Sequence, residues 1–233
     1  MAALFFLFAV FNSFENLETR KIMAIAPLES LEFANCPPET AQYLVVMLHG
    51  WGANYHDLKP LARMLDLPHC HFLFPNAPFP HFQSPQGRAW YALEREDFQG
   101  LPEARDRLFQ WLQTLSENTG IPPERTAMIG FSQGGAMTLD VGLQFNFAAL
   151  CSCSGYLHYE PQRRPGDFSP TLLIHGTQDP VVPIQAAHQA KTQLGQVGVP
   201  LDYFEFSGGH EIPAIALARI SQFLNQHLLQ KET

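Results

Sequence analysis

Short apolar segments alternate with longer amphipathic segments along this chain, and this alternation limits the possible folds more than any other feature. The apolar segments predict buried strands over residues 43–50, 71–75, 125–131, 147–154, 171–176 and 201–206. The amphipathic segments predict helices over residues 56–66, 102–120, 133–145, 185–195 and 211–231. Because strands that alternate with helices form parallel sheets, the sequence predicts an α/β protein with helices on both faces of a mostly parallel central sheet.

Length and loop composition favour one domain. A chain of 233 residues that is 46% hydrophobic can form one large core. Its connections are short except for residues 75–100, which are rich in proline and phenylalanine, and loops of that length usually carry function. Residues 155–170 are the one insertion outside the predicted core elements, and they are too short to suggest a lid domain. We therefore expect a single domain over residues 23–233, with no separate lid domain.

The first eleven residues, MAALFFLFAVF, are almost wholly apolar. This run is far short of the roughly 20 residues that a membrane span needs, and it lacks the basic leader and cleavage site of a secretory signal. Met23 begins a segment that looks like a natural domain start. We expect residues 1–22 to be a poorly ordered or dispensable leader, and we expect no stable membrane insertion.

Charge and cysteine usage exclude other classes of protein. The net charge is 14 − 22 = −8, without a basic run that could bind a nucleic-acid backbone. The four cysteines lack CxxC spacing and do not form a disulfide framework, so we interpret them as reduced core thiols of a cytoplasmic protein. The sequence HCH at 69–71 has no third convergent ligand, so we expect no metal site.

The sequence GFSQG at 130–134 fits the G-x-S-x-G nucleophile elbow and lies between a predicted strand and a predicted helix. At the tip of such a turn Ser132 adopts a strained backbone conformation. Larger side chains at the two flanking positions would collide with neighbouring backbone, which explains the glycines. The alternative is an N-cap serine in an ordinary glycine-rich turn.

A serine hydroxyl is a poor nucleophile at neutral pH, so it needs a base and a carboxylate that orients the base. In α/β-hydrolases the chain order is serine, acid, histidine. Asp179 follows the predicted strand 171–176, and His210 follows the predicted strand 201–206. Since both come after strand ends, we expect them to meet Ser132 at the carboxyl edge of the sheet. His49 comes before the serine and His175 comes before the acid, so both are in the wrong order. The other histidines and aspartates that we considered lie inside predicted helices, in other loops or at the start of a strand.

Two further features would complete such a site. Backbone N–H groups of Trp51 and Gln133 are placed to form an oxyanion hole, the first in the loop after strand 43–50 and the second directly after Ser132. Candidates for an apolar substrate pocket are Trp51, Phe79, Trp90 and Val182, and the same loops also offer Phe82, Tyr91 and Val181. Each of these side chains could equally belong to the core.

The motifs LHGWGAN, FPNAP, GFSQGGAM, HGTQDPVVP and GGHEIP occur in this order, over about residues 30–228. On these motifs the chain resembles the phospholipase/carboxylesterase family of α/β-hydrolases, which includes acyl-protein thioesterases. The resemblance implies Ser132 as nucleophile, Asp179 as acid, His210 as base and the amides of Trp51 and Gln133 as oxyanion hole. Trp51 departs from the leucine that is frequent in the thioesterase branch, which affects pocket shape.

These observations predict a serine hydrolase that cleaves carboxylic esters or thioesters through an acyl-enzyme, without a metal or organic cofactor. We expect a broad-specificity carboxylesterase acting on small or medium esters, as a monomer or weak homodimer. One alternative is an acyl-protein thioesterase or lysophospholipase, or a peptidase with the same triad. Another is a non-catalytic binding protein of this fold, which would be expected to lack a triad residue or an oxyanion-hole glycine.

Overall fold

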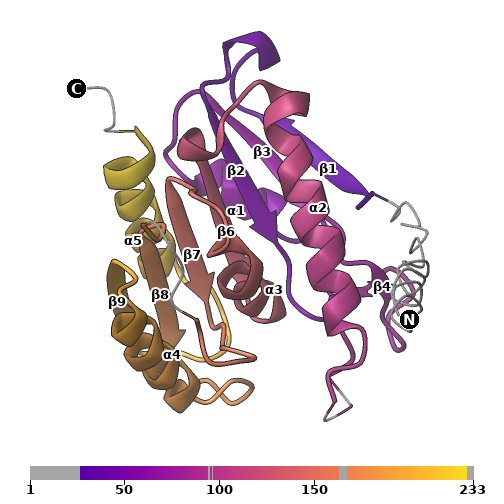
Figure 1. Ribbon diagram of the computed structural model, residues 1–233, viewed down its shortest axis with the longest axis vertical. Coiled ribbons are helices and arrows are strands. Elements are labelled where there is room, and N and C mark those ends of the chain that lie inside the picture. Colours follow the sequence, from indigo (N-terminus) through magenta and orange to yellow (C-terminus); the bar gives the residue numbers. More distant parts are fainter. Residues whose placement is uncertain (1–26, 94, 96, 163–166, 230–233) are drawn as a thin grey trace, which may run out of the picture.

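The computed structural model describes residues 27–93, 95, 97–162 and 167–229. Within these residues the main sheet has seven strands in the order β1-β3-β2-β6-β7-β8-β9 (Figure 1). Every neighbouring pair is parallel except β1 and β3, which are antiparallel at one edge. The predicted mostly parallel sheet is therefore confirmed. The expected leader, residues 1–22, lies outside the described residues.

The strands of the main sheet are β1 (Ser30–Ala34), β2 (Tyr43–Leu48), β3 (Cys70–Pro75), β6 (Thr126–Phe131), β7 (Ala149–Cys153), β8 (Thr171–Gly176) and β9 (Leu201–Phe206). All six predicted strands are present, with ends that differ by a residue or two. Strand β1 was not predicted. It lies at the edge and alternates between exposed and half-buried residues, so it lacks the continuous apolar run of the central strands.

The helices are α1 (Lys59–Met64), α2 (Leu101–Thr119), α3 (Gln133–Met137), α4 (Ile184–Val197) and α5 (Ala214–Leu224). π-Helical turns continue α3 over Thr138–Gly142 and α5 over Asn225–Leu229. Gly120 ends α2 in the left-handed conformation, as predicted, with φ 72° and its N–H bonded to the Ser116 carbonyl. Helix α1 is shorter than predicted.

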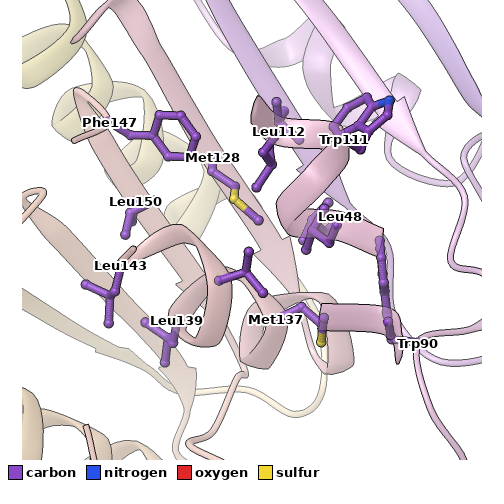
Figure 2. Close-up of a cluster of buried hydrophobic side chains, with 14 of the residues drawn as sticks. Leu48, Trp90, Trp111, Leu112, Met128, Met137, Leu139, Leu143, Phe147 and Leu150 are labelled. Atoms are coloured by element: carbon purple, nitrogen blue, oxygen red, sulfur yellow. The ribbon is translucent and has the colours of Figure 1, made fainter. Parts of the chain in front are cut away.

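Helices cover both faces of the sheet, as predicted. Leu44, Val46 and Leu48 of β2 belong to the cluster that contains the buried residues of α2, α3 and α4, whereas Val45 and Met47 belong to the cluster with α1 and α5. This alternation is the two-residue period of a strand. In Figure 1, α2 crosses the front of the sheet and α1 lies behind it. Figure 2 shows the front cluster, where side chains of α2 meet Met128 of β6 and Met137 of α3.

Residues 75–100 form a folded segment after β3. It contains a small antiparallel ladder of β4 (Phe79–Pro80) and β5 (Arg88–Ala89). The Arg88 guanidinium donates hydrogen bonds to the carbonyls of Ala77 and Pro78, at 2.9 Å each. The backbone of Arg88 pairs with the loop after β2, because Gly52 N–H donates to its carbonyl and its own N–H donates to Ala53. The long segment therefore packs against the carboxyl end of β2.

Among the described residues, no separate lid domain covers the carboxyl edge of the sheet. No helix in this described part of the chain combines the length and the apolar character that a membrane crossing requires.

Candidate active site

Ser132 occupies a sharp turn between β6 and α3. Its backbone has φ 54° and ψ −117°, a conformation that non-glycine residues rarely adopt. A Cβ atom at Gly130 would lie 2.1 Å from the Gly134 carbonyl oxygen, and a Cβ atom at Gly134 would lie 2.3 Å from that of Leu48. The two glycines therefore allow the strand, the turn and β2 to pack backbone against backbone around the serine.

Ser132, His210 and Asp179 lie in hydrogen-bond contact, although they are distant in the sequence. The His210 Nε2 atom is 2.9 Å from Ser132 Oγ, and its Nδ1 atom is 2.7 Å from Asp179 Oδ2. Since a carboxylate only accepts hydrogen bonds, Nδ1 carries the proton and Nε2 is free to accept one from the serine. The arrangement can remove a proton from Ser132 and return it later to a leaving group.

Asp179 is positioned by the loop that follows β8. Its Oδ1 atom accepts hydrogen bonds from the N–H groups of Val181 and Val182, at 2.8 and 2.9 Å. Burial raises the pKa of this carboxyl group, but the hydrogen bonds from His210 and these two amides outweigh burial and hold the pKa below its ordinary value. Asp179 is therefore ionised at neutral pH and can stabilise a protonated His210.

His175 supports the same loop. Its side chain is buried, its Nε2 atom donates to the Val182 carbonyl at 2.8 Å, and it lies 3.5 Å from Asp179 Oδ2. The sequence argument set His175 aside because it precedes the acid in the chain. In the structure His175 lies beside Asp179, and its hydrogen bond fixes the backbone whose amides bind the Asp179 carboxylate.

His49 has a similar position at the end of β2. Its Nδ1 atom donates to the Gly50 carbonyl at 2.8 Å, and its Nε2 atom accepts from the N–H of Ala77 at 3.1 Å. Burial lowers the pKa of His49 to about 4, so the ring is neutral at physiological pH. The Gly50 carbonyl belongs to the peptide group that carries the Trp51 N–H, so His49 fixes the orientation of that N–H.

The two expected oxyanion-hole donors belong to segments that adjoin Ser132. A Cβ atom at Gly50 would be 3.4 Å from the Cβ of Ser132, which places the loop of Trp51 directly against the serine. Gln133 follows Ser132 as the first residue of α3, where the helix dipole also favours an anion.

The Gln133 side chain joins the serine turn to residues 90–91. Its Oε1 atom accepts from the Trp90 N–H at 2.8 Å, and its Nε2 atom donates to the Tyr91 carbonyl at 2.9 Å. The Trp90 indole donates to the His49 carbonyl at 3.0 Å and is fully buried. Trp90, a candidate for the substrate pocket, is therefore placed in the core, where it connects the long segment to β2 (Figure 2).

A pocket of about 330 Å³ opens beside Trp51. Two of the four candidate pocket residues, Trp51 and Phe79, line it, and its other lining residues are Pro80, His81, Phe82, Ala89, Tyr91, Ala92, Gln99, Gly100 and Glu103. Val182 is buried in the loop after β8, and neither it nor Trp90 lines this pocket. Phe82 and Tyr91, expected from the aromatic composition of the long loop, also line the pocket. Pro80, His81 and residues 99–103 were not predicted, because only the folded segment brings them to Trp51.

The described residues contain no group of three or more His, Cys, Asp or Glu side chains arranged to hold a metal ion. Cys70, Cys151 and Cys153 are buried free thiols, and Cys36 is a half-buried one.

Comparisons with known proteins agree with this architecture. The chain shares 29% identity over 215 residues with acyl-protein thioesterase 1 of Emericella nidulans, covering 78% of this chain and 89% of the relative. It shares 31% identity with acyl-protein thioesterase 1 homolog 2 of Dictyostelium discoideum, covering 69% and 80%. Among solved structures, esterase PE8 superposes with a TM-score of 0.80 at 30% identity, covering 87% of this chain and 100% of that one.

The family model described as phospholipase/carboxylesterase matches residues 30–228. The match contains β1 to β9 and all the residues of the site described above. The chain therefore belongs to the phospholipase/carboxylesterase family and has the α/β-hydrolase fold.

Proposed function

We propose that Ser132 is the nucleophile of a two-step acyl transfer in which His210 is the base and Asp179 orients it. Membership of the family makes the chain a hydrolase of esters or thioesters. In the first step Ser132 Oγ attacks the carbonyl carbon of the substrate while His210 Nε2 takes the hydroxyl proton. The leaving alcohol or thiol then receives this proton, and the acyl group remains bound to Ser132.

In the second step His210 takes a proton from a water molecule, whose oxygen attacks the acyl carbon. The bond between this carbon and Ser132 Oγ then breaks, Oγ receives the proton from His210, and the carboxylic acid is released. Both steps place negative charge on the former carbonyl oxygen. We assign the stabilisation of that charge to the backbone N–H groups of Trp51 and Gln133. His49 supports the first donor by fixing its peptide group, and the start of α3 supports the second.

The observation that carries this proposal is the chain of contacts from Asp179 Oδ2 through His210 to Ser132 Oγ, at 2.7 and 2.9 Å. A structural serine would not need the strained backbone of Ser132 or a base in hydrogen-bond contact. A non-catalytic protein of this fold would have no reason to retain the full set of three side chains. These features favour catalysis over binding alone.

We propose a carboxylesterase acting on small or medium esters, with acyl-protein thioesterase activity as the second candidate. The pocket of about 330 Å³ favours the first because it is near the lower end of the range for small-molecule sites. The curated relatives named acyl-protein thioesterases favour the second. The free cysteines favour a reducing compartment such as the cytoplasm.

The test is hydrolysis of p-nitrophenyl butyrate and of a palmitoyl thioester by wild type, Ser132→Ala and the matched control Ser221→Ala on α5. We expect the wild type and Ser221→Ala to turn over the butyrate ester, and Ser132→Ala to lose on the order of 10⁶ in turnover. A wild-type rate in Ser132→Ala would exclude this nucleophile. Faster turnover of the thioester would reverse the order of the two candidates.

A further inference from the structure

The pocket beside Trp51 and the proposed base lie on opposite sides of Ser132. The pocket is lined by residues from the loop after β2 and from the segment after β3. Asp179 and His210 follow β8 and β9. In the sheet, β2 is the neighbour of β6 on one side, whereas β8 and β9 lie on the other side beyond β7. A substrate bound at Ser132 therefore has the pocket on one side and the base on the other.

This geometry decides which part of the substrate the pocket can receive. The attacked carbon carries Ser132 Oγ, the oxyanion, the leaving group and the acyl substituent. The leaving group must face His210 Nε2 to receive its proton, and the oxyanion must face the amides of Trp51 and Gln133. The acyl substituent is the remaining group, and the pocket beside Trp51 lies away from His210.

The Trp51 side chain is a fixed wall of this pocket. Its indole meets the His81 imidazole almost perpendicularly, with ring centroids 4.2 Å apart, and the Phe82 ring lies 5.9 Å away. His81 is itself held, because its Nδ1 atom accepts hydrogen bonds from the backbone N–H groups of Gln83 and Ser84 at 3.2 and 3.1 Å. Rotation of the indole would require this cluster to move as well.

Other residues limit the pocket elsewhere. A Cβ atom at Gly100 would lie 2.7 Å from the Phe79 ring, so this ring packs directly on the backbone where α2 begins. Glu103 also lines the pocket, and its carboxylate forms an ion pair with Arg107 at 2.6 Å. Because removing water from charged groups is costly, an apolar chain should follow the aromatic walls and avoid this ion pair. The pocket therefore offers apolar contact over a limited length.

We propose that this pocket binds the acyl chain of the substrate and that the Trp51 indole sets the longest straight chain that it accepts. The inference rests on the proposed function, since it assumes attack by Ser132. Trp51 thereby has two separate contributions: its backbone N–H serves the oxyanion, and its side chain determines acyl specificity. A smaller side chain at this position retains the N–H and lengthens the pocket.

The experiment measures kcat/KM for p-nitrophenyl esters with straight acyl chains of increasing length, for wild type, Trp51→Leu and Tyr159→Leu. Tyr159 is an exposed aromatic residue that does not line the pocket. Within the pocket each methylene should raise kcat/KM about fourfold. The wild type should reach an optimum and then decline, and Trp51→Leu should move the optimum to a longer chain. For the first acyl chain that is longer than the wild-type optimum, kcat/KM relative to its value at that optimum should be about fourfold or more higher in Trp51→Leu than in wild type.

A second series varies the alcohol at a constant acyl group. Trp51→Leu should leave the shape of this series unchanged, and Tyr159→Leu should leave both series unchanged. An unchanged acyl optimum in Trp51→Leu, or a shift in the alcohol series instead, would overturn the acyl assignment. These outcomes differ from failure of the proposed function, which would show as Ser132→Ala retaining wild-type hydrolysis of the same esters.

Discussion

The two sides of Ser132 are built in different ways. On the base side, Asp179 and His210 lie in short loops directly after β8 and β9, and the hydrogen bonds that hold Asp179 come mainly from its own loop. On the pocket side, the segment 75–100 holds the loop of Trp51 through Trp90 and Arg88. Gln133 joins the same segment to the turn that carries Ser132. Local loops thus supply the proposed chemistry, and long-range contacts supply the shape of the pocket.

The largest effect should come from the base side. Asp179→Asn keeps the shape of the side chain but favours the wrong His210 tautomer, because an amide N–H can face Nδ1. We expect turnover of a p-nitrophenyl ester to fall about 10⁴-fold, with little change in the unfolding midpoint. The matched control is Asp66→Asn. Asp66 is exposed and precedes β3, so it lies at the amino ends of the parallel strands, away from the site. A loss of less than tenfold in Asp179→Asn would show that catalysis does not need the Asp179 carboxylate to orient His210.

A smaller effect should come from the contact that joins the two sides. Gln133→Leu retains the backbone N–H but leaves the Trp90 N–H and the Tyr91 carbonyl buried without their partner. We expect the free energy of unfolding to fall by roughly 2–6 kcal/mol, since each of the two unpaired buried groups costs about 1–3 kcal/mol. Urea titration measures this change, and Gln189→Leu on the exposed face of α4 is the control. Equal stability of the two variants would mean that the segment 75–100 is held without Gln133.

The smallest effect concerns His49. The unfolded chain protonates this ring near pH 6.5, whereas the folded chain does so only near pH 4. The stability that the neutral ring provides is therefore complete above pH 6.5 and is lost as the pH falls toward 4. Between pH 7 and pH 5 we expect a loss of about 2 kcal/mol from His49 alone.

His49→Gln cannot take up a proton, so denaturant titrations at the two pH values should show a weaker pH dependence by this amount. The exposed His56→Gln is the control and should retain the wild-type dependence. If His49→Gln and wild type lost the same stability between pH 7 and pH 5, the neutral buried ring would not be the cause.

The same contrast explains what could be predicted from sequence. The six central strands, the α2 cap at Gly120 and the contact of Ser132, Asp179 and His210 follow from local patterns, since apolar runs form strands and parallel strands end at one edge. The edge strand β1 lacks such a run and was not predicted. The placement of Trp90 does not follow, because an aromatic residue in a long loop looks the same whether it lines a pocket or the core. Its burial depends on Gln133, 43 positions away in the chain.

The histidines teach a related lesson. His49 and His175 both precede a glycine at the end of a strand, and chain order alone removed them from the list of candidate bases. The structure places both beside the proposed machinery, where each donates a hydrogen bond to a loop carbonyl. A His-Gly pair at the end of a predicted strand was the sequence signal that could have identified these two supporting histidines.

The account depends most on Ser132 being the nucleophile. Its most direct test is to treat the wild-type chain with a fluorophosphonate, whose phosphorus is attacked by an activated serine with loss of fluoride, and to locate the adduct by peptide mass spectrometry. We predict one adduct per chain, on the peptide that carries Ser132, and none in Ser132→Ala. A label on a different serine, or an active enzyme that is never labelled, would contradict the account.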